Sequence, residues 1–250
     1  MAELTAGDER YRDDRGAADP AVDAALAAYA AGTGGEHAAL IALAATRLLV
    51  PVVAVTTESA EPAGPGPIAG DGTSPLAGEK ASQMSLPALV GRDGRRALPV
   101  FTCVEAVRRW QPSARPVPVP AASVWQSAVE EAAAVVIDIA GPVPLVIEGA
   151  RLAALAATGT ALGMYEDPDV WQQVAAAAGQ IAPGVRVKLS PPHGDIDFTL
   201  ELAPPEGATE PVPSEVADRI GDAVLASLRD RARAGIAVLV RPAGSAVSWS

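Results

Sequence analysis

The sequence predicts an α+β protein in which a mixed sheet with flanking helices is followed by a smaller α-β-β-α-β unit. Two observations carry this prediction. Apolar segments flank the Asp93-Gly94 pair, which supplies the positive φ angles of a tight hairpin turn, and two more flank Gly141-Pro142. Other apolar segments are joined by stretches with helical spacing. Strands that are joined partly by tight turns and partly by helices indicate a mixed sheet that carries helices.

The N-terminal segment is highly charged, and helices follow it. Residues 1–19 mix acidic and basic side chains with almost nothing apolar, so we expect a disordered acidic tail. The spacing of apolar residues then predicts a helix that begins at Pro20 and stops at Gly32. A second stretch with the same spacing predicts a helix that runs to Leu48.

The first strand is predicted at residues 48–55, where the chain is β-branched and apolar. Pro51 has no N–H to give to a sheet, so we expect this strand at an edge or at a bulge. Such an edge can pair across a dimer axis, but a proline there equally prevents pairing, so the oligomeric state stays open. Residues 58–79 contain repeated Pro and Gly without periodicity, which predicts a long flexible loop.

A helix is predicted directly after the first hairpin. Thr102 and Glu105 match the S/T-x-x-E capping box, in which the hydroxyl caps a backbone N–H and the carboxylate binds the amide of the cap residue. The helix would then begin at Cys103 and run to Trp110. An extended segment, a helix from residue 121 to 134, two strands and a further helix are expected beyond it.

The chain divides into two predicted units, residues 20–158 and residues 163–243. The smaller unit consists of a helix, two strands, a second helix and a last strand. Its second helix is predicted from Ser214 to Arg233, with apolar residues along one stripe. Acidic side chains lie in the first turn of this helix and arginines, including Arg231, lie in the last, which suits the helix dipole.

Three stretches of the larger unit form a recognisable pattern: LLVPVV, MSLPALVGRDGRRALPVFTCVEAVRRWQPSARPVPVP and VVIDIAGPVPLVIEG. In these stretches the chain resembles the SseB-type N-terminal domain family as found in actinobacterial proteins, over about residues 20–157. The resemblance implies a fold rather than a reaction, because the family brings no established catalytic residues. Some members carry a label borrowed from type III secretion. A secretion translocator that inserts into membranes would need a long apolar span, and we expect none in this chain.

Composition and charge argue against several classes of function. The formal charge of −11 and the pI near 4.6 work against binding to phosphate backbones, so no nucleic-acid partner is expected. A single cysteine rules out an internal disulfide and no secretory signal is visible, which predicts a cytoplasmic protein. The longest apolar run is interrupted by Arg47 and Pro51 and is too short to span a bilayer, so no membrane partner is expected.

Cys103, the only cysteine, has two interpretations. The first turn of a helix and the nearby Arg108 and Arg109 would stabilise a thiolate, which would make Cys103 a nucleophile or an oxidant sensor. The chain offers only His37 and His193 as a base, and His37 lies within an Ala/Leu-rich predicted helix while His193 lies in a distant loop. We favour the second interpretation, in which Cys103 is a small residue that fills the first helical turn behind its cap.

Other candidate motifs are weaker. His193, Asp195 and Asp197 alternate before a strand, a spacing that suits a metal, but partner ligands are missing and no metal is predicted. Asp138 and Glu148 each interrupt an apolar strand and resemble an acid/base pair. We favour outward-facing or strand-end positions for them, because nothing in the sequence fixes their separation. No Gly-x-Ser-x-Gly or phosphate-loop motif occurs, and no cofactor is predicted.

One local excess of positive charge stands out from the acidic background. Six arginines in this region face only Asp93 and Glu105: Arg92, Arg95, Arg96, Arg108, Arg109 and Arg115. Guanidinium groups and free amides at a helix start both favour anions. The candidate site for an acidic peptide, a carboxylate or a phosphorylated partner consists of Arg95, Arg96, Arg108, Arg109, Thr102 and Cys103. The alternative is a set of solubilising arginines that pair with acids elsewhere.

Two classes of function remain. We favour a non-enzymatic interaction or regulatory module that recognises a protein partner. The alternative is an enzyme or small-molecule binder that uses Cys103, the carboxylates or the cleft between the two units. An enzyme would gather several titratable side chains in one pocket, whereas a module would expose an apolar or Arg-rimmed patch.

Overall fold

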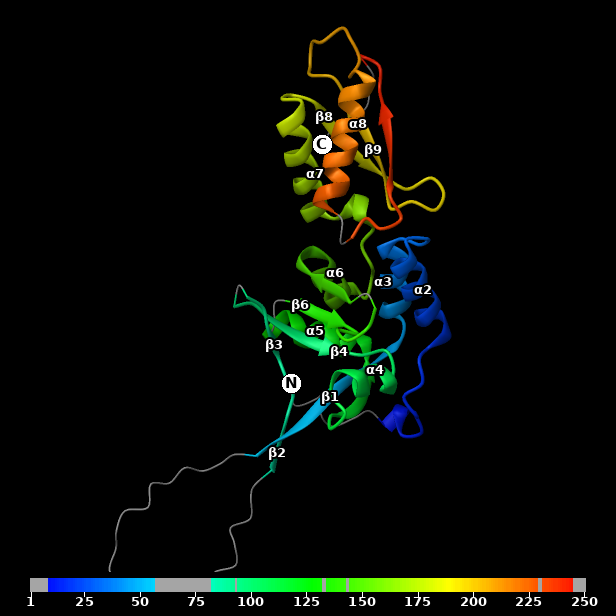
Figure 1. Ribbon diagram of the computed structural model, residues 1–250, viewed down its shortest axis with the longest axis vertical. Coiled ribbons are helices and arrows are strands. Elements are labelled where there is room, and N and C mark those ends of the chain that lie inside the picture. Colours follow the sequence, from blue (N-terminus) through cyan, green and yellow to red (C-terminus); the bar gives the residue numbers. More distant parts are fainter. Residues whose placement is uncertain are drawn as a thin grey trace, which may run out of the picture.

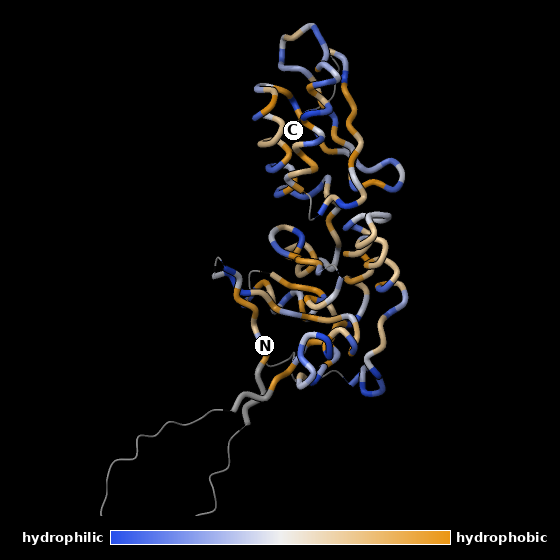
Figure 2. The backbone as a smooth tube through the Cα atoms, in the orientation of Figure 1, coloured by the Kyte–Doolittle hydropathy of each residue, from blue (hydrophilic) through white to orange (hydrophobic). Residues whose placement is uncertain are grey.

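The computed structural model describes residues 9–56, 82–92, 94–131, 134–142, 144–228 and 231–244 (Figure 1). The loop predicted at 58–79 and the first eight residues of the predicted tail lie outside the described residues. Helices and mixed sheets make up two units, which confirms the α+β class. Hydrophobic residues follow the strands of both units (Figure 2). Every helix within these ranges is too short or too polar to cross a membrane.

The larger unit begins with two helices and a three-stranded sheet. Its first elements are η1 (Glu9–Tyr11), α2 (Pro20–Ala31), α3 (Glu36–Ala44), β1 (Arg47–Thr56) and β2 (Ser82–Ser85). β1 is antiparallel to β2 on one side and to β5 (Arg115–Pro120) on the other, so β1 as a whole is not the expected edge strand. Pro51 pairs with Pro116, another residue without an N–H, and the pairing with β2 begins only at Val53.

Four strands form the second sheet, in the order β3-β4-β6-β7. They are β3 (Leu89–Val90), β4 (Arg96–Val100), β6 (Ala134–Ile137) and β7 (Leu145–Glu148). The outer pairs are the two predicted hairpins and are antiparallel. β4 and β6 are parallel, and the crossover between them contains α4 (Val104–Trp110), β5 and α5 (Ala121–Glu131). Phe101 and Leu49 join the two sheets by exchanging hydrogen bonds of 2.8 and 2.9 Å.

Helices cover one face of the four-stranded sheet. Alternate strand residues belong to the main hydrophobic core of the unit, among them Leu98, Val135 and Ile147. Side chains from α2, α3, α5 and α6 (Gly149–Thr158) complete this core. Strand residues with the opposite orientation, such as Val136 and Val146, lie outside it. The sheet therefore has an inner face toward the helices and an outer face.

The smaller unit has the predicted order of helix, two strands, helix and strand. Its elements are η2 (Met164–Glu166), α7 (Pro168–Ile181), β8 (Arg186–Ser190), β9 (Phe198–Ala203), α8 (Ser214–Ser227) and β10 (Ile236–Val240). β9 lies in the middle of the sheet, antiparallel to β8 and parallel to β10. A separate apolar core lies between this sheet and the helices α7 and α8.

The end of α8 differs from the prediction. The helix stops at Ser227, short of the expected end at Arg233, so Arg231 and Arg233 do not lie in its last turn. Both arginines bind the larger unit instead. Arg233 donates to the carbonyl oxygens of Tyr29 and Ala30 at 3.0 and 2.9 Å. These arginines therefore join the two units.

Four charged residues meet where the units touch: Glu36 at the start of α3, Arg151 in α6, Asp167 before α7 and Arg231 after α8. Arg151 donates to Glu36 at 2.5 Å. Arg231 donates to Glu36 at 2.9 Å and to Asp167 at 2.7 Å. The side chains of Glu36 and Asp167 are each only 1% exposed. This charge cluster is thus buried and balanced.

Residues 9–19 contact the larger unit, whereas their composition predicts a disordered tail. The Nε of Arg47 donates to Asp14 at 2.5 Å, and these two side chains are 11% and 17% exposed. The carbonyl of Gly16 accepts the backbone N–H of Val104 at 2.8 Å. Asp14 is thus a largely buried partner of Arg47, whereas the Arg12–Glu9 pair of the same segment is exposed, with side chains 74% and 90% accessible.

Candidate functional site

A pocket lies at the carboxyl ends of the parallel strands β4 and β6. Thr102 closely follows β4, and Asp138 directly follows β6. In sheets with parallel strands, ligands are commonly bound in the crevice outside these carboxyl ends. The cavity, which we call the Asp138 pocket, has a volume of about 170 Å³.

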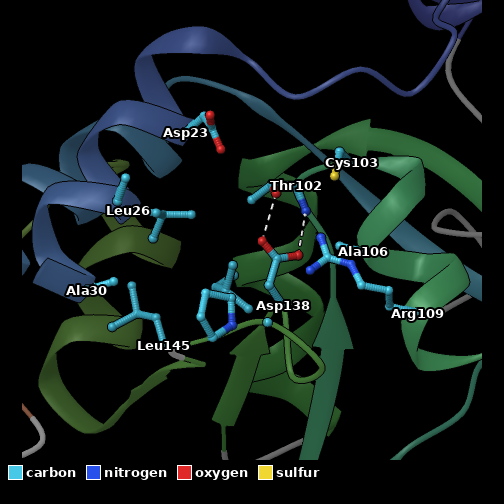
Figure 3. Close-up of a pocket in the computed structure, with 13 residues that line it drawn as sticks. Asp23, Leu26, Ala30, Thr102, Cys103, Ala106, Arg109, Asp138 and Leu145 are labelled. Carbon is cyan, nitrogen blue, oxygen red and sulfur yellow. Dashed lines mark hydrogen bonds between the residues drawn. The ribbon is translucent and has the colours of Figure 1, made fainter.

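Asp138 is held in the pocket by Thr102 (Figure 3). Its carboxylate accepts the Thr102 backbone N–H at 3.0 Å and the Thr102 hydroxyl at 2.7 Å. The φ angle of Asp138 is 48°, in the left-handed region that aspartate tolerates better than most residues. Burial raises the pKa of the Asp138 carboxyl, while the bonds from Thr102 and the charge of Arg109 act against that rise.

The walls of the Asp138 pocket come from α2, α4 and β7. α2 contributes Asp23 and Leu26, α4 contributes Arg109, and β7 contributes Leu145 (Figure 3). The two carboxylates and the single guanidinium leave one negative charge in excess when all three are ionised. This balance favours a small ligand that donates hydrogen bonds or carries a positive charge.

The predicted capping box does not form. The Thr102 hydroxyl binds Asp138 rather than an amide of α4. Cys103 is the N-cap residue, and its side chain makes no capping hydrogen bond. The first amide of α4, that of Val104, is bound by the carbonyl of Gly16. Thr102 and Cys103 therefore line the Asp138 pocket without forming an anion site at the helix start.

The structure separates the predicted arginines into two groups. Arg95 and Arg96 lie at the start of β4, whereas Arg108 and Arg109 lie in the last turn of α4, beyond the other end of that strand. Arg95 pairs with Glu148 at 2.7 Å. Arg109 lines the Asp138 pocket. The four guanidinium groups are thus not brought together into one site.

Arg95 and Arg96 line a different hollow, on the outer face of the four-stranded sheet. This outer groove has a volume of about 360 Å³. Its lining includes Leu89, Ala97, Val136, Ile139, Val146 and Glu148. The groove is therefore apolar along its floor and charged at the end where β4 begins.

Asp138 and Glu148 do not form an acid/base pair. In the register of β6 and β7, Ala134 faces Glu148 and Ile137 faces Leu145. Asp138 follows Ile137, so the two carboxylates lie at opposite ends of this strand pair. Strands rise about 3.3 Å per residue, which separates their backbones by roughly 10 Å or more.

The alternating residues before β9 have different environments. His193 and Asp195 are exposed. Asp197 is buried, and its carboxylate accepts the backbone N–H groups of Glu36 at 3.4 Å and of Ala234 at 2.8 Å. Asp197 thus belongs to the contact between the two units. Across the described ranges, no three His, Cys, Asp or Glu residues lie together in a way that would hold a metal ion.

Asp23 is a pocket residue that sequence reasoning missed. It comes from the first turn of α2, far from β6 in the chain, so its position beside Asp138 depends on the tertiary fold. The one feature of the sequence that could have indicated a pocket here is Asp138, a carboxylate that directly follows a buried strand.

The profile of the SseB protein N-terminal domain matches residues 22–154, more than half of the chain. The chain belongs to the SseB N-terminal domain family. The Asp138 pocket and the outer groove both lie within this SseB domain. Searches among curated proteins and among solved structures find no match.

Proposed function

We propose that the protein is a non-enzymatic interaction module of the cytoplasm, which binds an extended acidic segment of a partner protein at the outer groove. The observation that carries this proposal is the exposed apolar surface of the groove. Val146 is 42% exposed and Val90 is 69% exposed, although both lie in strands of the sheet. Apolar patches with a charged rim are typical of surfaces that bind proteins.

The position of β7 supports binding of an extended segment. β7 is the last strand of its sheet, so a partner strand can add to it through main-chain hydrogen bonds. Val146 and Glu148 of β7 line the outer groove and also a second cavity of about 360 Å³, which Arg231 of the smaller unit helps to line. Space is therefore present on both sides of this edge.

The charges of the groove favour an acidic partner. Arg95 and Glu148 form an ion pair whose side chains are 59% and 37% exposed. Such a pair contributes only about 0–1 kcal/mol, so a carboxylate of the partner can compete with Glu148 for the Arg95 guanidinium. Arg96, which is also exposed, adds a second positive charge at the same end of the groove.

Selection from a library of random displayed peptides on the immobilised full chain tests this proposal. Enriched peptides are expected to combine acidic and apolar residues. A synthetic enriched peptide, followed by fluorescence anisotropy, should bind the Val146→Glu variant about tenfold or more weakly, because a buried like charge replaces an apolar contact. Arg95→Ser with Arg96→Ser should also weaken binding.

The matched control is Val129→Glu, which places the same charge on an exposed valine of α5, away from the groove. This variant should bind the peptide as the wild type does. Enrichment of basic peptides, or equal binding to the Val146→Glu and Val129→Glu variants, would overturn the proposal.

A second candidate function is the binding of a small organic cation in the Asp138 pocket. The observation that favours it is the excess of carboxylate over guanidinium groups in this cavity, from Asp23, Asp138 and Arg109. Thermal unfolding in the presence of a series of short alkylamines tests it. A ligand should raise the midpoint for the wild type but not for the Asp23→Asn variant, and equal shifts in both proteins would reject the site.

A further inference from the structure

β10 forms an open apolar edge of the sheet in the smaller unit. It is the end strand of the order β10-β9-β8, and among the described residues it pairs only with β9. It is the red strand at the margin of the unit in Figure 1. Its sequence is IAVLV, and Val238 and Leu239 are 36% and 41% exposed. The strand thus presents apolar side chains beside a row of backbone hydrogen-bonding groups that no other strand of the described ranges pairs.

Edge strands of monomeric proteins are normally protected by charged side chains, by proline or by short length. The opposite edge of this sheet follows the rule, because β8 carries Arg186 and Lys188. β3, an edge of the larger sheet, is only two residues long. β10 has none of these protections over its five residues. It therefore has the properties of a strand that pairs with another chain.

We propose that β10 pairs antiparallel with β10 of a second copy of this chain, across a two-fold axis at Val238. This register places Ala237 opposite Leu239 of the second copy, and Ile236 opposite Val240. Ile236 and Val240 pack against the core of the unit, so Ala237 and Leu239 lie on the opposite, outer face of this sheet. On that face each Ala237 meets the larger Leu239 of the other copy, and such cross-strand neighbours stabilise a sheet. The paired sheets become one continuous sheet of six strands.

The residues that flank β10 fit the same register. Arg241 falls opposite Gly235 of the second copy, which has no side chain, so no like charges meet. Arg241 is in addition held by Glu201 at 2.9 Å within its own chain. Pro242 follows Arg241 and has no N–H to donate, so it ends the ladder at both sides of the axis. Self-pairing is thus favoured along the strand and bounded at its ends.

Sedimentation equilibrium of the full chain over a series of concentrations tests the proposal. The wild type should form a dimer. Leu239→Lys should raise the dissociation constant of this dimer about tenfold or more, because it places a charge in the apolar contact. Leu239 is exposed on the outer face, so this variant should keep the fold, which circular dichroism checks. Val129→Lys, at an exposed valine of α5 in the larger unit, is the matched control and should leave the dimer intact.

A charge-swap variant tests the register. Leu239→Lys combined with Ala237→Glu puts Lys opposite Glu twice across the axis, so the double variant should recover most of the dimer that Leu239→Lys loses. A wild-type monomer at all concentrations would overturn the proposal, as would a dimer that is insensitive to Leu239→Lys. A dimer that forms only after removal of residues 245–250 would also overturn it, because it would identify that segment as the native cover of β10.

Discussion

Arg231 and Glu36 lie 195 residues apart in the chain, and the guanidinium donates to the Oε2 atom of Glu36 from Nη2 at 2.9 Å and from Nε at 3.2 Å. The same guanidinium binds Asp167 at 2.7 Å. Glu36 belongs to the SseB domain and Arg231 to the smaller unit, so this contact joins them. Buried ion pairs add little net stability, but a structure that leaves one member unpaired is strongly disfavoured. We therefore expect the charge cluster to favour one arrangement of the two units.

Arg231→Ala should lower the free energy of unfolding by about 3–5 kcal/mol, because it leaves the buried Asp167 without its close partner and Glu36 with Arg151 alone. Urea titration followed by circular dichroism measures the change. Arg12→Ala is the control, since Arg12 pairs with Glu9 where the side chains are 74% and 90% exposed. This control should cost at most about 1 kcal/mol, and an equally small loss for Arg231→Ala would show that the cluster is not needed.

Asp197 should make stability depend on pH. Burial raises the pKa of Asp197 to about 6, whereas an aspartate in an unfolded chain titrates near 3.9. The folded protein then binds this proton more tightly than the unfolded chain does, so the contribution of Asp197 to stability falls as the pH rises from about 4 to about 6. The free energy of unfolding of the wild type, minus that of Asp197→Asn, should decline over this interval and level off above it.

Urea titrations at a series of pH values measure this difference. Asp195→Asn removes a carboxylate from the exposed part of the same loop and should change stability by less than about 0.5 kcal/mol. A difference that rises with pH, or stays constant between about 4 and 6, would contradict the assignment to Asp197.

The periodicity of apolar residues predicts most elements of the fold, but it does not predict the tertiary partners of the charged side chains. The hairpins, the order of the smaller unit and the start of α2 follow from local spacing and turn residues. The end of α8 does not, because Arg231 and Arg233 bind groups that approach only in the tertiary structure. The sequence did not predict that residues 9–19 pack against the larger unit for the same reason, since Asp14 and its ion-pair partner Arg47 are 33 residues apart.

Thr102 should matter to stability through Asp138 rather than through a capping box. Thr102→Val removes the hydroxyl that binds the Asp138 carboxylate at 2.7 Å and should cost about 1–3 kcal/mol. Glu105 is exposed and its pairing distance to Arg108 is 4.0 Å, so Glu105→Ala should cost less than about 0.5 kcal/mol. Thr102→Ser keeps the hydroxyl and serves as the control. A large loss of stability for Glu105→Ala would contradict this account and would indicate that the capping box forms.

Cys103→Ser should stabilise the protein. Cys103 is the N-cap of α4 but makes no side-chain capping bond, whereas serine at this position accepts an amide hydrogen and contributes about 0.5–1 kcal/mol. Thermal unfolding measures the gain. Cys103→Ala, which also removes the thiol but supplies no acceptor, should show no gain. Equal midpoints for the serine and alanine variants would contradict the expected cap.

The candidate site was predicted in part. Arg95, Arg96, Arg108 and Arg109 are close in sequence, but the intervening strand β4 carries two of them away from the other two. The apolar floor of the outer groove was not visible in the sequence, because Val146 lies in an apolar stretch that is typical of a buried strand. Its exposure follows from the pairing of the strands and from the position of the helices on the inner face.

Amide chemical-shift mapping of the full chain with an enriched acidic peptide is the most direct test of the proposed interaction surface. The largest changes should fall on β7 and on the outer-groove residues Ala97, Val136 and Val146. They should be lost in the Val146→Glu variant and retained in Val129→Glu. Changes confined to the Asp138 pocket or to β10, with the outer groove unaffected, would contradict the proposal.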